Sequence, residues 1–194
     1  LGQGKKRGEA SQVVSKENLW KRIIETMKIL DDRDVFLLGA GGMNAAPIAA
    51  LLGATAVDAT SWRVNAMLKQ VFATDYGRFI KVGSRNDNMD KLWAQDFLES
   101  RTTDESYPFF GMNLKGLQRL LRTSNDARSV HNLWESQNDA TRVSEFESDP
   151  EGLHQMLKQR FTSSGWSDWK NLKLLDKAIE ARRSVKPIEN FAKA

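Results

Sequence analysis

The clearest hydrophobic pattern near the start of the chain has the period of an α-helix. Apolar residues recur every three or four positions among charged ones, which predicts an amphipathic helix that begins at Ser15 or Lys16 and ends at Leu30. The residues before it are glycine-rich and basic and predict a loop. The uninterrupted apolar run from Val35 to Leu38 predicts a parallel strand that is buried on both faces.

A glycine-rich turn follows that strand and opens a short helix. Three glycines break the apolar run, at positions 39, 41 and 42. Asn44 is suited to cap a helix over Ala45 to Leu52, and Gly53 is suited to end it in a left-handed conformation. The pattern therefore predicts a strand, a turn and a helix in direct succession.

A second strand, Ala54 to Val57, comes next and ends on Asp58. The whole stretch is one βαβ unit with a carboxylate at its carboxyl edge, where parallel sheets place their functional groups. Asp58 is therefore the first candidate catalytic residue.

The rest of the chain changes to a mostly helical pattern. A helix start is expected at Trp62 to Leu68 and a strand or hairpin piece at Gly77 to Val82. Further helices are predicted over residues 89–98, 113–121, 130–143, 151–161 and 169–184. A complete eight-unit barrel needs about 250 residues. The predicted fold class is therefore α/β, as a small open sheet or as the later part of a larger barrel.

Composition narrows the class of protein without naming a function. The chain has 194 residues, 40% of them hydrophobic, and Lys plus Arg exceed Asp plus Glu by 29 to 25. This mild basic excess permits a polyanionic partner. The absence of cysteine excludes disulfides and thiolate metal ligands. The sequence shows neither a membrane span nor a signal-peptide core, so we expect a cytoplasmic protein without a membrane partner.

Four motifs, in order, resemble those of tRNA-guanine transglycosylases, and in particular of the related DNA-modifying 7-deazaguanine transglycosylases. Leu1-Gly2-Gln3-Gly4 resembles the family's base-pocket loop, and Leu38-Gly39-Ala40-Gly41 resembles the loop after its next barrel strand. The stretch GATAVDATSWR, residues 53–63, resembles the segment that carries the nucleophilic aspartate, and Asp58 takes that position. Ser129 to Asn132 resembles the late motif whose histidine, here His131, binds zinc in family members.

The departures from the family pattern matter as much as the matches. Residues 103–110 hold none of the three cysteines that the family supplies there. Structural zinc normally needs several Cys or His ligands, so we expect the zinc to be lost, with no cofactor and with His131 the one remaining candidate ligand. The family's other catalytic acid lies in an N-terminal barrel half that this sequence does not contain. The general acid or base is therefore not identified.

The resemblance implies a pentosyltransferase that exchanges guanine in a nucleic acid for a 7-deazaguanine base. Asp58 would form a covalent aspartyl-nucleotide intermediate, with DNA slightly preferred over tRNA. The implied base-binding residues are Leu1, Gly2, Leu38, Gly39 and Gly41. Expected nucleic-acid contacts are Trp62, Arg63, Lys69, Arg78, Lys81 and Arg85, in which Trp62 would stack on a base and the cations would meet phosphates.

The resemblance also implies an organisation and partners. Residues 1–85 would form the C-terminal part of a TIM-like barrel, and residues 86–194 a helical region that corresponds to the zinc subdomain and the C-terminal helices. The partners would be the missing N-terminal barrel half, the nucleic acid and, as an open possibility, a second copy of the chain.

Each of these residues also has a plainer interpretation. Asp58 would be a loop or capping carboxylate, His131 a helix-start or core histidine, and most tryptophans packing residues. The glycine turn lacks the third glycine of the dinucleotide fingerprint. Two alternative functions remain open: a catalytically incomplete nucleic-acid-binding or scaffolding subunit, and an α/β domain that binds a small metabolite at the glycine loops.

Overall fold

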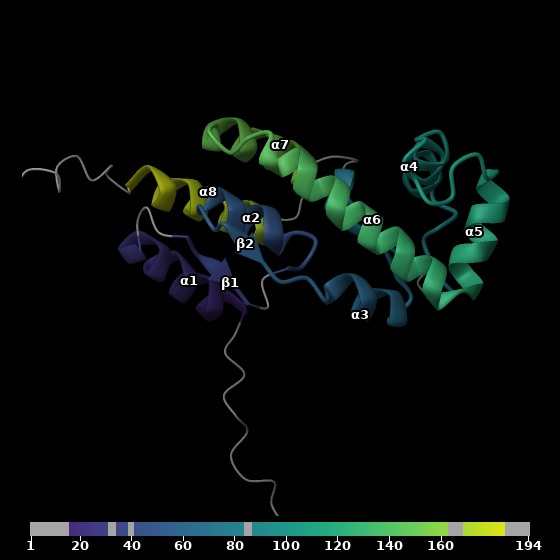
Figure 1. Ribbon diagram of the computed structural model, residues 1–194, viewed down its shortest axis with the longest axis horizontal. Helices are drawn as coiled ribbons and strands as arrows, with labels where there is room; N and C mark the ends of the chain where they lie inside the picture. The colour runs from purple at the N-terminus through teal and green to yellow at the C-terminus, as the bar shows by residue number, and fades with distance from the viewer. Residues whose placement is uncertain (1–15, 31–33, 39–40, 84–86, 163–168, 185–194) are drawn as a thin grey trace, which may run out of the picture.

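The computed structural model describes residues 16–30, 34–38, 41–83, 87–162 and 169–184 (Figure 1). Helices dominate, and two small sheets accompany them. In chain order the elements are α1 (Lys16–Leu30), β1 (Phe36–Leu37), α2 (Ala45–Leu51), β2 (Ala56–Val57), α3 (Ser61–Met67), β3 (Gln70–Ala73), the 3₁₀ turn η1 (Thr74–Tyr76), β4 (Arg78–Lys81), α4 (Leu92–Thr102), α5 (Leu114–Thr123), α6 (Asn125–Ser144), α7 (Pro150–Thr162) and α8 (Trp169–Ser184).

The predicted βαβ unit is present. Strands β1 and β2 pair in parallel, with Phe36 opposite Ala56 and Leu37 opposite Val57, and α2 connects them. Backbone hydrogen bonds extend the pairing at both ends, from Thr55 N to Val35 O and from Asp58 N to Leu37 O. This arrangement is α/β in character, and a closed barrel is not seen among the described residues.

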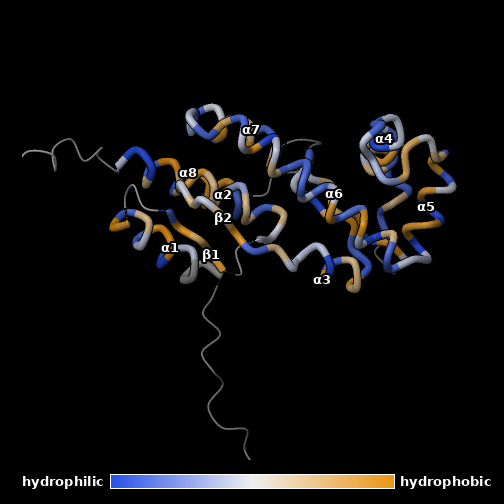
Figure 2. The backbone as a smooth tube through the Cα atoms, in the orientation of Figure 1, coloured by the Kyte–Doolittle hydropathy of each residue, from blue (hydrophilic) through white to orange (hydrophobic). Residues whose placement is uncertain are grey.

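The first strand differs from its prediction in length and in burial. It has two residues, and its side chains are not buried on both faces: Val35 is buried, whereas Phe36 is 58% and Leu38 is 78% exposed. Figure 2 colours the residues of β1 as hydrophobic, next to α1. An uninterrupted apolar run identified the strand correctly, but one of its faces has no cover within the described part of the chain.

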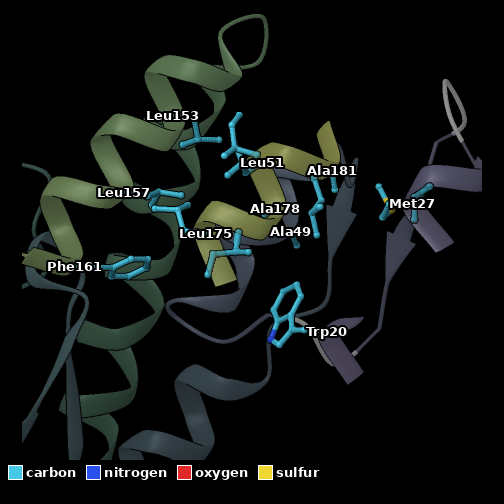
Figure 3. Packing of buried hydrophobic residues seen from close by; sticks show 14 residues of the cluster. Trp20, Met27, Ala49, Leu51, Leu153, Leu157, Phe161, Leu175, Ala178 and Ala181 are labelled. Atoms are coloured by element: carbon cyan, nitrogen blue, oxygen red, sulfur yellow. The ribbon is translucent and has the colours of Figure 1, made fainter. Parts of the chain in front are cut away.

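One hydrophobic core joins this unit to the end of the chain. Trp20 and Met27 of α1 pack with Ile48 and Leu51 of α2, and α7 and α8 close the cluster from the other side (Figure 3). Leu157, Phe161 and Leu175, from these two C-terminal helices, are almost fully buried there. The C-terminal helices therefore hold the βαβ unit in place.

The second core lies around an antiparallel hairpin. Strands β3 and β4 pair from Gln70 opposite Lys81 to Ala73 opposite Arg78. The hairpin packs against α4, α5 and the beginning of α6, with Phe97, Leu117 and Leu121 among the buried residues. The sequence pattern predicts β4 but not β3. Each core takes residues from both sides of position 85, and the proposed domain boundary there stays a prediction.

Most of the predicted helices are confirmed. Helix α8 has the predicted bounds, and α7 differs by one residue at each end. Helix α6 begins five residues earlier than predicted, at Asn125, because the Ser124 side chain accepts a hydrogen bond from Ala127 N and caps it there. Gly53 has the expected positive φ, +92°, after α2. None of the described helices combines the length and the apolar character needed to span a membrane.

Candidate functional site at the end of the parallel strand pair

Asp58 lies directly after β2, and the glycine turn lies against it. A Cβ atom at position 41 would overlap the backbone carbonyl of Asp58, so only glycine permits this approach. The Ser61 hydroxyl donates a hydrogen bond to Gly41 O at 2.5 Å. Gly41, Asp58 and Ser61 therefore meet at the carboxyl edge of the strand pair, as the βαβ pattern predicts.

Asn44 orients the turn differently from the prediction. It occupies the N-cap position of α2, but its side chain makes no capping hydrogen bond. Instead, its Nδ2 donates to Gly77 O at 2.8 Å, in the turn between β3 and β4. Its Oδ1 is buried without a hydrogen-bond partner among the described residues. Asn44 thus connects the glycine turn to the hairpin.

The strand pair gives Asp58 an apolar setting. Phe36 and Ala56 are paired and both exposed, and Leu38, two residues after Phe36, is mostly exposed as well. Alternation along β2 assigns Asp58 to the same face as Ala56. Asp58 itself is half-buried. Of the residues expected to bind the base, Gly41 is at this site and Leu38 directly follows β1. Leu1, Gly2 and Gly39 lie outside the described residues.

Trp62 stands near the site, and its backbone is fixed. It is the second residue of α3, half-buried, four positions after Asp58. Asn132 of α6 donates from Nδ2 to both Trp62 O and Gln70 O at 3.0 Å, while its Oδ1 accepts from Phe72 N at 2.7 Å. The buried Asn132 amide therefore positions α3 and the hairpin relative to α6.

The structure separates the predicted basic contacts into two places. Lys69 and Lys81 are exposed at one end of the hairpin, where Gln70 pairs with Lys81. Arg78 is at the opposite end, with its guanidinium 4.5 Å from the centre of the Trp93 ring. Arg63 is exposed on α3, and Arg85 lies outside the described residues. One continuous rim through these cations is thus not formed by the part of the chain that is described.

Two other arginines that follow in the sequence have structural partners. Arg122 pairs with Asp87 and Asp90. Arg128 is buried, and it donates from Nε to Ala66 O and from Nη1 to Leu121 O, both at 2.8 Å. Because these are the carbonyls near the ends of α3 and α5, Arg128 stabilises helix termini rather than contacting solvent.

His131 is a fully buried core histidine. Its Nε2 must donate to Phe72 O at 2.8 Å, because a carbonyl only accepts, so its Nδ1 accepts from the Tyr107 hydroxyl at 2.6 Å. Burial lowers the pKa of His131 and keeps the ring neutral. Burial, together with the charge of Glu135, raises the pKa of Tyr107. With both nitrogens engaged, His131 fits the core interpretation and not that of a metal ligand. No group of three or more potential metal ligands is found among the described residues.

This histidine gives a prediction for the pH dependence of stability. Below pH 6.5 the unfolded chain binds a proton that folded His131, with its lowered pKa, does not bind. The contribution of His131 to the free energy of unfolding is therefore complete above pH 6.5. It is lost as the pH falls towards the pKa of the folded state, and the free energy of unfolding then decreases by at most about 1.4 kcal/mol per pH unit. We expect urea unfolding between pH 7 and pH 5 to show this slope. His131→Gln should remove it, and His154→Gln should keep it; a slope that persists in His131→Gln would contradict the assignment.

The sequence pattern does not predict the largest network of ion pairs among the described residues. Seven side chains form one network in the middle of the molecule, namely Thr74, Asp75, Arg101, Glu135, Asp139, Arg142 and Arg160. Glu135 is fully buried and accepts from Arg101 Nε at 2.5 Å and from the Thr74 hydroxyl. Arg160 forms a two-point contact with Asp139, at 2.5 and 3.1 Å.

The charges in this network are balanced. Burial opposes ionisation of Asp75, but Arg101 and Arg142 outweigh it and lower the pKa of the carboxyl group. Burial likewise opposes the charge of Arg101, and Glu135 and Asp75 outweigh it and raise the pKa. Three arginines face three carboxylates, so the network links the hairpin, α4, α6 and α7.

A cleft of about 740 Å³ opens beside the site. It lies between α2 and the region where α6 turns into α7, and Gly41, Gly42 and Trp62 contribute to its lining. Val57 and Ala59 line it, whereas Asp58 between them does not. The cleft therefore borders the loop that carries Asp58, and Asp58 is not part of its lining.

Comparisons of the chain with protein-family models, with curated proteins and with solved structures find no match.

Proposed function

We propose that this chain carries the nucleophilic part of a nucleic-acid guanine transglycosylase, a pentosyltransferase that exchanges guanine for a 7-deazaguanine. The observation that carries the proposal is the meeting of Asp58 with Gly41 and Ser61 at the carboxyl end of β2. The Asp58 backbone packs against the glycine turn there, at the edge where parallel strands place functional groups.

Asp58 would attack the anomeric carbon of the nucleotide and guanine would leave with the bonding electrons. The 7-deazaguanine would then attack the same carbon and release the carboxylate. A carboxylate suits both steps, because it is an anionic nucleophile towards an oxocarbenium-like centre and a good leaving group afterwards. Proton transfer to guanine and from the incoming base needs a partner group, which the proposal assigns to the missing barrel half.

The exposed face of the strand pair supports that assignment. Phe36 and Leu38 expose apolar surface beside Asp58, and parallel strands normally occur in sheets with both faces covered. In the proposed assembly β1 and β2 belong to a larger, TIM-like barrel, and the missing strands cover these side chains. Asp58 would then lie at the catalytic rim of that barrel.

The nucleic acid would meet Trp62 and the exposed cations Arg63, Lys69 and Lys81. Trp62 would stack on an unpaired base, and the cations would contact phosphates. DNA is slightly preferred over tRNA as the substrate, because Ser61-Trp62 resembles the DNA-modifying branch of the family. Arg78 would contribute less, because its guanidinium already packs on Trp93.

Base exchange tests the proposal. The complete native assembly containing this chain is incubated with labelled guanine and DNA and, in a separate reaction, with labelled guanine and tRNA. The label incorporated into each polymer is then counted. We expect incorporation into one polymer, and a loss of at least about 10³-fold in Asp58→Asn, because the amide is not a nucleophile at neutral pH. Asp96→Asn, an exposed carboxylate on α4, is the matched control. Equal incorporation by both variants would refute the role of Asp58.

A second candidate is a nucleic-acid-binding or scaffolding subunit without activity of its own. The same exposed Phe36 and Leu38 favour it, because they offer a surface for a partner whether or not Asp58 reacts. Polymer binding that persists in wild type and in Asp58→Asn, with no incorporation by either, would select this candidate.

A further inference from the structure

Positive charge is concentrated in the first and the last described helices, α1 and α8. Together these two helices carry nine Lys and Arg residues and four Asp and Glu residues. The other described residues hold 13 Lys and Arg against 16 Asp and Glu, which is an acidic excess. The two helices contact each other (Figure 1). The basic excess of the described chain therefore comes from one pair of neighbouring helices.

We propose that α1 and α8 form a binding surface for the phosphate backbone of a nucleic acid, separate from the candidate site at Asp58. Lysine and arginine side chains bind such a backbone by displacing its condensed counterions, without reading the base sequence. The proposal rests on the proposed function only in taking a nucleic acid as the partner. The α1–α8 basic surface is defined by five exposed side chains, namely Lys21, Arg22, Lys28, Lys173 and Lys177.

The cations of this surface are available for a ligand. Within the described part of the chain none of the five makes a hydrogen bond or an ion pair, unlike Arg183, which contacts Glu151 at two points. Lys173 and Lys177 are four residues apart on α8, and like charges at this spacing destabilise a helix. An anion that contacts both lysines would remove this repulsion.

Few acidic side chains compete with phosphates for these cations. Asp176 contacts His154 at 3.2 Å and so marks the side of α8 that faces α7. The next residue, Lys177, lies about 100° further around the helix and is directed away from that contact. Two other exposed carboxylates are described on the two helices, Glu25 and Glu180. The surface therefore keeps an excess of positive charge.

The arrangement suits an extended polyanion better than a single anion or a lipid surface. Lys21 and Lys28 are seven residues apart, so about 10 Å separates them along the helix axis, more than one phosphate group can cover. The apolar side of α1, with Trp20 and Met27, is buried in the core. The helix therefore has no wide apolar face to insert among lipids.

The surface is also within reach of a substrate at Asp58. The Arg182 guanidinium, near the end of α8, lies against Gly53, where a Cβ atom would overlap it. Gly53 and Asp58 are five residues apart, so their Cα atoms are separated by at most about 18 Å. Double-stranded DNA carries roughly ten charges in that length of axis. One nucleic acid can therefore contact Asp58 and the α1–α8 basic surface together.

Fluorescence anisotropy of a labelled DNA duplex, and separately of labelled tRNA, tests the proposal with the full chain between about 50 and 200 mM salt. We expect the double variant Lys173→Gln, Lys177→Gln to weaken binding severalfold, and Lys21→Gln, Lys28→Gln to do the same. Each should reduce the slope of log K against log salt concentration by about 1–2, because each lysine neutralises up to one phosphate.

Lys91→Gln, Lys158→Gln is the matched control. It removes the same charge from two exposed positions outside the surface, one directly before α4 and one on α7. Its affinity should stay within about twofold of wild type, and all variants should keep their helical circular dichroism. Equal weakening by the control would overturn the proposal, because only the net charge would then matter.

Two further comparisons identify the partner and separate this proposal from the proposed function. Polyglutamate that binds more tightly than DNA or tRNA, with the same loss in the lysine variants, would assign the surface to an acidic protein and overturn the proposal. Failure of both nucleic acids to bind the wild type would also overturn it. Asp58→Asn should bind them normally. Lysine-dependent binding without base exchange by the wild-type assembly would refute the proposed function and leave this surface intact.

Discussion

Glu135→Ala is expected to lower the free energy of unfolding by about 3–5 kcal/mol, the usual cost of removing one partner from a buried ion pair. Glu135 is fully buried and accepts hydrogen bonds from Arg101 and Thr74. Its removal leaves the Arg101 guanidinium beside only one carboxylate, Asp75, which is partly exposed. Urea unfolding at neutral pH measures the change.

Two further variants separate the ion pair from general damage to α6. Glu145→Ala, at the exposed C-terminal end of the same helix, should change stability by only about 0.5 kcal/mol. The double variant Arg101→Met, Glu135→Leu should cost less than the sum of its single changes, because no uncompensated charge remains. Additive costs, or a Glu135→Ala as stable as wild type, would show that the network does not hold the structure together.

Gly41→Ala is expected to abolish base exchange, with a loss of about 10²-fold or more. The new Cβ would overlap the Asp58 carbonyl, so the loop that carries the nucleophile must move. A displacement of about 1 Å at a reacting group is enough for such a loss. The incorporation assay described above, with the complete assembly, measures it.

Gly42→Ala is the matched control. A Cβ at position 42 would meet only the Cβ of Ala45, at an ordinary 3.6 Å. Activity should therefore remain within a few-fold of wild type, and both variants should keep their helical circular dichroism. Equal activity in Gly41→Ala and wild type would mean that the approach of the turn to Asp58 has no functional role.

Local signals in the sequence were sufficient for most of the elements. The βαβ unit, the end of α2 at Gly53 and the bounds of α8 depend on apolar periodicity and on glycine, and all are confirmed. Strand β3 was missed because four residues directly after a helix carry little pattern of their own. Its position depends on pairing with β4 and on Asn132, contacts that are distant in sequence.

Helix α6 shows why the charged network could not be predicted. Its buried face carries His131, Asn132 and Glu135, whereas Val130 is 42% and Leu133 is 36% exposed. Periodicity alone assigns charged residues to the solvent-facing side of a helix, which is the reverse of what is found. Only the partners that come from the hairpin, α4 and α7 make this polar face stable in the interior.

The candidate site was predicted in part. The sequence placed Asp58 and the glycine turn at the same edge, and Gly41 and Asp58 are in contact there. It did not predict the exposed apolar face beside them or the separation of Arg78 from Lys69 and Lys81. The exposed face depends on what covers the strand pair, and the separation of the cations depends on how the hairpin is oriented. Local sequence patterns predict neither of these.

Covalent trapping tests the central claim, the nucleophilic role of Asp58, most directly. The complete assembly is incubated with labelled DNA or tRNA and denatured, and the adduct is located by mass spectrometry after proteolysis. The account predicts a polynucleotide attached to the peptide that contains Asp58, present with wild type and Asp96→Asn and absent with Asp58→Asn. An adduct on another residue, or polymer binding without any adduct in wild type, would contradict it.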